Sequence, residues 1–264
     1  MNKAPLGVFD SGIGGLTVAR ALFERLPQES VIYFGDTARV PYGPKSPDTV
    51  RRYSGEILAY LLQRGVKAVV VACNTSTAHA LGYLKERSPV PVVGVIEPGA
   101  RAAVAATKTG TIGVIGTAGT IASGAYERAI KALRADARVH SQPCPLFVPL
   151  VEEGWFEHPA AELIAREYLE PLRRAKVDVL VLGCTHYPLL KPLIARVMGP
   201  DVQLVDSAEE TATVVSRELE RLDLLSNGGS HEHRFVVSDD EQHFRKVGAL
   251  FLGEQLKQVE VAPL

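Results

Sequence analysis

The sequence predicts an α/β fold with two similar doubly wound lobes, each built on a parallel β-sheet. Short apolar runs alternate with stretches that carry apolar residues at helical spacing, and this pattern indicates βα units with helices on both faces of a parallel sheet. The pattern restarts near residue 110. A chain of 264 residues is long enough for two small domains with real cores.

The first part of the chain contains four predicted strands, at residues 6–9, 31–36, 68–73 and 90–96. The first three are followed by predicted helices at 12–26, at 48–65 and from residue 74 through about Arg87. Each strand is short and rich in apolar residues, many of them β-branched, which is typical of strands buried on both faces.

The second part repeats the first. GVFDSGIGG (7–15) resembles GVIGTAGT (113–120), and VKAVVVACNT (66–75) resembles KVDVLVLGCTH (176–186). Asp10 and Gly116 are 106 residues apart, and Cys73 and Cys184 are 111 residues apart. Two segments that keep nearly one offset indicate an internal duplication, with the proline-bearing stretch 95–100 near the lobe boundary.

The C-terminal part adds further elements. Ser207 and Glu210 fit an S-x-x-E capping box at the start of a helix. Residues 226–233 are expected to form a turn-rich loop, 233–240 a strand and 241–254 a helix. This tail is too short for a third domain, so we expect it to pack on one of the lobes.

Composition argues against several classes of protein. The net charge is −1 and no basic run stands out, so we expect no nucleic-acid partner. No apolar run approaches the roughly 18 residues of a membrane span, and the N-terminus lacks an apolar segment long enough for a signal peptide. Three cysteines do not form a disulfide framework. We therefore expect a cytoplasmic protein with free thiols and no membrane partner, in which Cys144 is incidental.

Cys73 and Cys184 each follow an apolar strand directly. In an open parallel sheet, ligands bind outside the carboxyl ends of the strands. Each cysteine is also expected beside the N-terminus of a following helix, where the positive end of the helix dipole would lower its pKa and favour a thiolate.

Four interpretations of the two cysteines are open. They could be buried structural residues, or zinc ligands together with His186, with or without His79, although no C-x-x-C spacing exists. They could form a disulfide, which a reducing compartment disfavours. They could also face each other across a substrate, so that one thiolate removes a proton from carbon and the opposite thiol returns one to the other face. Such a pair inverts a stereocentre without a cofactor.

Five motifs in order, FDSGIGGLTV, GDTARVPYG, ACNTSTA, PLVEEG and GCTHYPLL, resemble those of the glutamate racemases, within the cofactor-independent aspartate/glutamate racemase superfamily. The resemblance covers essentially the whole chain. It implies interconversion of L- and D-glutamate, which supplies D-glutamate for peptidoglycan, with no cofactor and no metal. It also implies a homodimer, an active site in the cleft between the two lobes, and a C-terminal segment that returns to the first lobe. The lobes would then comprise residues 1–96 and 209–264 for the first and 97–208 for the second. The alternative is aspartate racemase or another racemase of the superfamily.

The resemblance also implies roles for individual residues. Cys73 matches the base that deprotonates D-glutamate, and Cys184 the base for L-glutamate. Asp10 matches a carboxylate beside the first cysteine, and His186 a group beside the second. Glu152 matches a carboxylate near that histidine, with its neighbour Glu153 as an open alternative. Asp10 could instead cap the first helix, His186 could merely fill space, and either glutamate could be a surface charge.

A glutamate substrate needs donors for two carboxylates and acceptors for its ammonium group. The residues that match the contacts to the α-carboxylate and ammonium are Ser11, Asn74, Thr75 and Thr185. Pro41, Tyr42 and Gly43 match a loop whose backbone N–H groups hold the side-chain carboxylate, and Asp36 could orient this loop. Thr117 and Thr120 could add hydroxyls from the second lobe, or could be N-caps only.

Two functions of other classes remain as rivals. DSGIGGLT follows a strand as a dinucleotide-binding loop does, but it lacks the third glycine of G-x-G-x-x-G, and Asp10 would place negative charge near a pyrophosphate. A binding module for acidic amino acids would bind glutamate without exchanging its α-proton.

Overall fold

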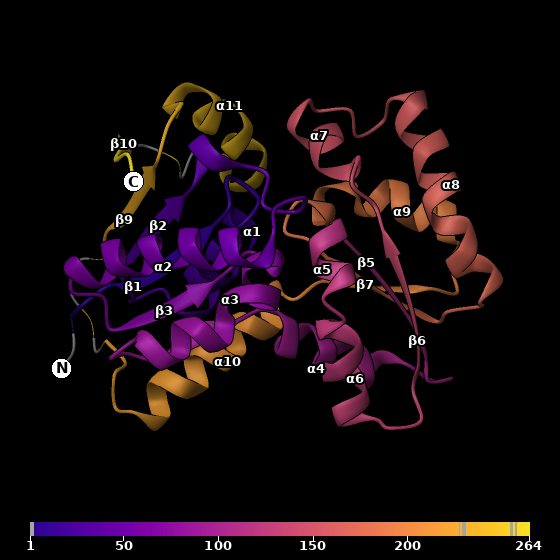
Figure 1. Cartoon of the computed structure of the whole chain (residues 1–264), viewed down its shortest axis with the longest axis horizontal. Coiled ribbons are helices and arrows are strands. Elements are labelled where there is room, and N and C mark those ends of the chain that lie inside the picture. The colour runs from indigo at the N-terminus through magenta and orange to yellow at the C-terminus, as the bar shows by residue number, and fades with distance from the viewer. Residues whose placement is uncertain (1–2, 227, 229–230, 254–255, 257) are drawn as a thin grey trace.

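The computed structural model describes residues 3–226, 228, 231–253, 256 and 258–264. Within these ranges the chain forms two α/β lobes that lie side by side (Figure 1), each with its own sheet. All the strand pairings in both sheets are parallel. The predicted fold class is therefore confirmed.

The sheet of the first lobe has six strands and combines segments from both ends of the chain. Its order is β10 (Val259–Val261), β9 (His233–Val237), β2 (Val31–Gly35), β1 (Leu6–Asp10), β3 (Ala68–Val71) and β4 (Val92–Gly94). Since β9 pairs with β2 along its whole length, the C-terminal segment is part of this sheet rather than a separate unit.

Helices cover both faces of this sheet because alternate residues of each strand point to opposite faces. Leu6 and Val8 of β1 share a buried cluster with residues of α1 (Leu16–Arg25), α10 (Ala208–Arg221) and α11 (Glu241–Leu252). Phe9 belongs to a second cluster with residues of α2 (Pro47–Gln63) and α3 (Asn74–Arg87). The arrangement is visible on the left side of Figure 1.

The sheet of the second lobe repeats the central part of the first. Its order is β6 (Arg138–Pro143), β5 (Thr111–Gly116), β7 (Val179–Gly183) and β8 (Gln203–Val205), which corresponds to β2-β1-β3-β4. The segment around β5 is the one whose sequence resembles the segment around β1, and β7 likewise resembles β3. The same strand order in both lobes agrees with the internal duplication predicted from the sequence.

The helices of the second lobe also lie on both faces of its sheet. Ile112 and Val114 of β5 pack with α4 (Ile96–Ala106) and α6 (Ala125–Leu133). On the other face, Leu180 and Leu182 of β7 pack with α8 (Pro159–Arg174) and α9 (Lys191–Met198). Two short helices, α5 (Ala118–Ala122) and α7 (Phe147–Glu152), follow β5 and β6 at the carboxyl ends of the strands.

Several local predictions need correction. The first helix begins at Leu16 rather than at residue 12, because Gly12 donates its backbone N–H to the Asp10 carboxylate and stays in a loop. Ser207 precedes α10 but makes no side-chain capping bond. The carboxylate of Asp206 accepts the hydrogen bond from the Ala208 N–H instead, so the predicted capping box is wrong. The strand predicted at 90–96 ends at Gly94, since α4 begins at Ile96.

Two C-terminal predictions extend past the described ranges. The turn-rich loop predicted at 226–233 includes residues 227, 229 and 230, and the helix predicted at 241–254 includes residue 254, all of which lie outside the described residues. The described part of that helix, α11, ends at Leu252. Among the described residues, no helix combines the length and the apolar character required to cross a lipid bilayer.

Candidate active site

A small cavity lies at the carboxyl ends of the central strands, between the lobes. Eleven of its lining residues are predicted site residues: Ser11, Pro41, Tyr42, Gly43, Cys73, Asn74, Thr75, Thr117, Cys184, Thr185 and His186. The other three predicted site residues, Asp10, Glu152 and Thr120, stand behind this lining and form hydrogen bonds to members of it. Both predicted catalytic cysteines therefore face one cavity, Cys73 from the first lobe and Cys184 from the second.

Cys73 lies two residues beyond β3, at the N-cap of α3, because the strand ends at the rim of the sheet and the polar run from Asn74 starts the helix. Its sulfur accepts a hydrogen bond from the backbone N–H of Ser76 at 3.4 Å. The thiol also lies 3.7 Å from Ser11 Oγ. These groups fix the side chain at the cavity wall, where it is 5% exposed.

Asp10 is fully buried at the end of β1 and accepts hydrogen bonds from Gly12 N–H at 3.0 Å and from the Thr185 hydroxyl at 3.4 Å. It does not cap α1, which has no side-chain cap. Burial raises the pKa of Asp10, against the lowering effect of the nearby His186 charge. Burial and the charge of Asp10 together raise the pKa of Cys73 to about 11. The expectation of a lowered pKa at Cys73 is therefore wrong, because burial outweighs the helix N-terminus.

Cys184 has a different partner. Its sulfur lies 3.9 Å from His186 Nδ1, and His186 Nε2 lies 3.0 Å from Glu152 Oε1. His186 is 3% exposed and therefore forms the centre of a buried chain from thiol to carboxylate. Glu152, rather than Glu153, makes this contact. Burial alone would raise the pKa of Glu152, but the hydrogen bond and the charge of His186 lower it.

Cys184 does not cap an α-helix. It immediately follows β7, and the residues after it form a 3₁₀-helix, η2 (Tyr187–Leu190), before α9 begins at Lys191. The expected helix N-terminus is absent from this position, and the neighbouring imidazole supplies the positive charge instead. Burial would lower the pKa of His186, but hydrogen bonds to Cys184 and Glu152, with their charges, raise it to about 10.

The raised pKa of His186 predicts a pH-dependent contribution to stability. A histidine in the unfolded chain titrates near 6.5, whereas His186 titrates at about 10 in the folded protein. The stabilisation is therefore fully present below pH 6.5 and is lost as the pH rises towards 10. We expect the difference in unfolding free energy between wild type and His186→Asn to shrink over this interval in urea titrations. A difference that stays constant with pH would contradict the assignment of an imidazolium to His186.

A second network supports the loop of residues 40–43. Asp36, at the end of β2, accepts hydrogen bonds from the Tyr42 hydroxyl, from Arg39 Nε at 2.8 Å and from Ser238 Oγ at 2.8 Å. Tyr42 is 1% exposed, so its buried side chain and the hydrogen bond to Asp36 hold the loop in place. Asp36 thus holds the loop that the resemblance assigns to the side-chain carboxylate, in line with its predicted role.

Direct hydrogen bonds connect the lobes around the cavity. Thr75 Oγ1 lies 2.9 Å from Thr117 Oγ1 and 3.2 Å from Thr120 Oγ1. Gly119 donates its N–H to Gly43 O at 2.9 Å. Thr117 also caps α5, so its role as an N-cap is confirmed, and a contact of its hydroxyl with a substrate stays a prediction. The cavity measures only about 20 Å³, room for about one water molecule, so an amino acid does not fit unless the groups around the cavity move apart.

The glycine-rich segment after β1 closes against the second lobe instead of forming a phosphate loop. A Cβ on Gly14 would lie 2.5 Å from His186 Nδ1 and closer still to Thr185 Oγ1. A Cβ on Gly15 would lie 2.5 Å from Asp10 Cβ. These glycines are needed for close protein contacts, which argues against the dinucleotide-binding alternative.

We expect Gly14→Ala to hold the lobes apart. A displacement of about 1 Å between reacting groups lowers the rate of catalysis by roughly 10²-fold. The kcat/KM for proton transfer between a substrate and the two facing thiols should therefore fall by that order. Gly82→Ala is the matched control, since Gly82 lies inside α3 and has nothing within 4 Å of its Cβ position. Steady-state kinetics and thermal unfolding of both variants make the comparison. Full activity in Gly14→Ala would show that the close approach is dispensable.

The other interpretations of the cysteines find little support. Among the described residues no group of three or more His, Cys, Asp and Glu side chains could hold a metal ion, and His79 contacts Gly119 O at 3.0 Å. All three cysteines are free. Cys144 directly follows the edge strand β6, is fully buried, and has a pKa raised by burial and by Cys184.

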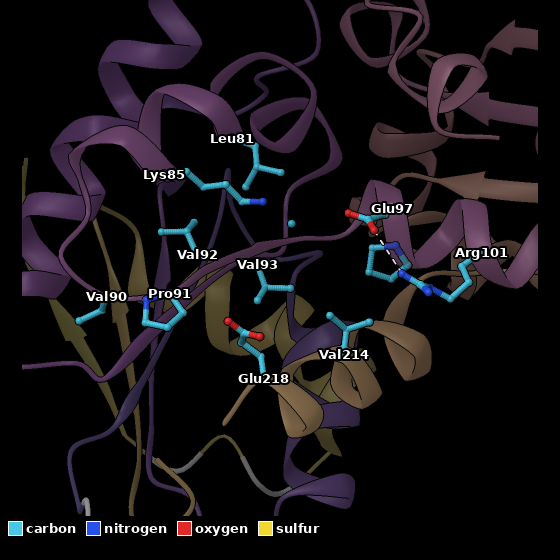
Figure 2. Close-up of a pocket in the computed structure, with 12 residues that line it drawn as sticks. Leu81, Lys85, Val90, Pro91, Val92, Val93, Glu97, Arg101, Val214 and Glu218 are labelled. Atoms are coloured by element: carbon cyan, nitrogen blue, oxygen red, sulfur yellow. Dashed lines mark hydrogen bonds and ion pairs between the residues drawn. The ribbon is translucent and has the colours of Figure 1, made fainter. Parts of the chain in front are cut away.

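A larger cavity, of about 380 Å³, opens between α3, α4 and α10 beside the edge strand β4 (Figure 2). Its charged residues are Lys85, Glu97, Arg101 and Glu218, of which Glu97 and Arg101 form an ion pair at 3.2 Å. The lining has no cysteine, so this cavity does not hold the pair of facing thiols that the sequence predicts.

Sequence reasoning missed some residues around the smaller cavity. Val40 and Val148 supply apolar lining from the two lobes. The sequence alone does not distinguish a valine that lines a cavity from any other apolar residue of a loop or short helix. Tyr126 was also missed, although its hydroxyl donates a hydrogen bond to Asn74 Oδ1 at 2.7 Å. From the sequence, an aromatic residue on the apolar side of a helix is expected to belong to the hydrophobic core, so Tyr126 was not a candidate site residue.

Comparison with known proteins agrees with this geometry. The family model for Asp/Glu/Hydantoin racemases matches residues 15–215. This chain belongs to the Asp/Glu/Hydantoin racemase family. Within it, the chain is 55% identical over 255 residues to a glutamate racemase from Geobacter metallireducens, covering 96% of this chain and 94% of that protein. The family predicted from the five motifs is confirmed.

Solved racemase structures are similar to this chain over nearly its whole length. The crystal structure of glutamate racemase isoform RacE1 from Bacillus anthracis matches with a TM-score of 0.94 and 42% identity, covering 100% of this chain and 98% of that chain. A glutamate racemase from Francisella tularensis, in complex with D-glutamate, matches with a TM-score of 0.94 and 39% identity, covering 99% and 98%.

Proposed function

We propose that this chain is a glutamate racemase that interconverts L- and D-glutamate by proton transfer between two thiols, without a cofactor. The observation that carries the proposal is that two free cysteines, from different lobes, line one cavity and have separate acid–base partners. Asp10 acts on Cys73 through its charge, and His186 lies beside Cys184. Glutamate as substrate is supported by the relatives and by the motif resemblance.

In the L-to-D direction, the Cys184 thiolate takes the α-proton, and the electron pair of the broken C–H bond passes to the carbon and its carboxylate. The Cys73 thiol then gives its proton to the opposite face of the same carbon. The reaction leaves Cys184 as a thiol and Cys73 as a thiolate, so the reverse reaction uses the same groups in exchanged roles. No electrons are gained or lost overall.

The electrostatics of the two sites suit this order of events. With a pKa of about 11, Cys73 holds its proton at neutral pH and can act as the acid. His186, with a pKa of about 10, carries a proton at neutral pH and can stabilise a thiolate at Cys184. These shifts support the proposed roles of Cys73 as the acid and His186 as the partner of Cys184 in the L-to-D direction.

Polar groups around the cavity suit the charged ends of the substrate. We assign Ser11, Asn74, Thr75 and Thr185 to the α-carboxylate and ammonium group, with Thr117 and Thr120 adding hydroxyls from the second lobe. Pro41, Tyr42 and Gly43 form the loop for the side-chain carboxylate. Closing the lobes around the substrate excludes water and strengthens these interactions at the reacting carbon.

The decisive experiment is incubation with each enantiomer of glutamate and of aspartate in deuterated water, with no added cofactor. Chiral chromatography should show that L- and D-glutamate converge on equal amounts, and NMR should show deuterium at the α-carbon. Faster racemisation of aspartate would favour the alternative within the superfamily. Binding without exchange of the α-proton would favour the binding-module hypothesis.

Three further assignments follow from the proposed activity. The product D-glutamate would be used for peptidoglycan, the enzyme would act in the cytoplasm, and it would form a homodimer. Light scattering at micromolar concentration measures the oligomeric state, and a monomer at all concentrations would contradict the dimer.

A further inference from the structure

Tyr126 lies between the two cysteine-bearing segments. It belongs to α6 of the second lobe, is 3% exposed, and donates its hydroxyl hydrogen to Asn74 Oδ1 at 2.7 Å. Asn74 is the residue after Cys73, on the first lobe. A single buried side chain of one lobe thus contacts the residue next to the catalytic cysteine of the other.

The ring of Tyr126 also contacts the segment that carries Cys184. A Cβ added to Gly183, the residue before Cys184, would lie 3.0 Å from Tyr126 Cε2. A Cβ added to Gly99 of α4 would lie 3.1 Å from Tyr126 Oη. The two glycines therefore form a slot that holds the ring, and its hydroxyl is aimed at Asn74.

The hydrogen bond determines how the Asn74 amide is oriented. An amide has an acceptor oxygen on one side and a donor NH₂ group on the other. With its oxygen bound by the Tyr126 hydroxyl, Asn74 keeps its two N–H donors for the cavity, which it lines. Burial raises the pKa of Tyr126, with the charges of Cys184 and Asp206 adding to the effect, so the hydroxyl keeps the proton that it donates.

We propose that Tyr126 is a positioning residue for racemisation, which acts through Asn74 by presenting the amide N–H groups to a substrate carboxylate in the closed form. This inference rests on the proposed function, since it assumes that Asn74 binds the substrate. The bond crosses between the lobes, so it joins the two halves of the site in the closed arrangement of this structure.

The test is a double-mutant cycle on kcat/KM with Tyr126→Phe, Asn74→Ala and the double variant. Tyr126→Phe should lower kcat/KM by about 3- to 10-fold, mainly through a higher KM, because one neutral hydrogen bond that orients a binding group is lost. The same change in the Asn74→Ala background should alter kcat/KM by less than about twofold, since no amide remains to be oriented. A full effect of Tyr126→Phe in both backgrounds would overturn the proposal.

Tyr187→Phe is the matched control. Tyr187 is also a buried tyrosine of the second lobe, and its hydroxyl donates to Cys144 O at 2.8 Å without crossing to the first lobe. Its effect on kcat/KM should be the same with and without Asn74→Ala, while its loss of thermal stability should be similar to that of Tyr126→Phe. A Tyr126→Phe protein that fails to fold would give the hydroxyl a structural role and also overturn the proposal.

The wild-type protein separates this inference from the proposed function. Wild type that racemises glutamate supports the function, and the cycle then tests Tyr126 alone. Wild type that racemises neither glutamate nor aspartate overturns the function and, with it, the role of Tyr126 in racemisation.

Discussion

Cys73→Ser and Cys184→Ser should each lower racemisation of glutamate by about 10³-fold or more in kcat/KM. A serine hydroxyl is a far weaker acid than a thiol, so it neither forms the anion that removes the α-proton nor returns a proton readily, and general acid–base catalysis contributes about 10²–10⁴-fold for each group. Coupled chiral assays with both enantiomers measure the loss. Calorimetry with D-glutamate should show that each variant still binds the substrate.

Cys144→Ala is the control for these variants. Cys144 is a third buried cysteine in the second lobe, outside the cavity lining, and its thiol contacts only the carbonyl of Gln142 among the hydrogen bonds of the described residues. It should keep wild-type kcat/KM. Full activity in Cys184→Ser would refute the two-thiol mechanism, whereas loss of activity in Cys144→Ala would show that changing any buried cysteine disturbs the fold.

His186→Asn and Asp10→Asn should each lower kcat by about 10²–10³-fold, and each variant should affect mainly one of the two directions of racemisation. His186 lies beside Cys184, so its loss should lower kcat mostly for L-glutamate. Asp10 is the carboxylate that can accept the proton of the Cys73 thiol when Cys73 serves as the base, and burial raises its own pKa, so its loss should lower kcat mostly for D-glutamate. Because the enantiomers have equal free energies, the equilibrium constant is one, and kcat/KM must fall equally in both directions for each variant.

The measurement is a full set of kcat and KM values for both enantiomers. Glu153→Gln is the control, since Glu153 neighbours Glu152 in sequence but makes no contact with His186, which bonds Glu152. Its kinetics should match wild type. Equal losses of kcat for L- and D-glutamate in both His186→Asn and Asp10→Asn would contradict the assignment of one partner to each cysteine.

The strand-end cysteines were predictable because they follow from a local pattern, an apolar run that ends in a thiol, and from the repeat that places the second copy 111 residues after the first. The geometry of parallel sheets then requires both to lie at a ligand-binding rim. The partner of His186 was open between Glu152 and Glu153, since neighbouring residues on a helix point in different directions and only the packing of α7 selects one.

Other features could not be predicted because they depend on the contact between the lobes. Tyr126 contacts Asn74 across a boundary between the lobes that local sequence does not encode, and its helix shows only the usual apolar face. The direction of the pKa shift at Cys73 was also missed, since a helix N-terminus is visible in the sequence but the depth of burial and the charge of Asp10 are not. At α10, Asp206 accepts the hydrogen bond from the Ala208 N–H in place of the predicted Ser207, a choice between two adjacent residues that the S-x-x-E pattern does not make.

The pairing of β9 with β2 has a consequence for how the chain folds during synthesis. Residues 111–205 hold every strand of the second sheet in one continuous stretch, so that lobe can assemble as soon as it leaves the ribosome. The first sheet receives its last two strands only from residues 233–261. Until then the apolar strand Val31–Gly35 pairs with β1 on one side only, and its other edge has no partner strand. A nascent chain that stalls at this stage would expose the hydrogen-bonding groups of that edge, and such edges are prone to aggregation.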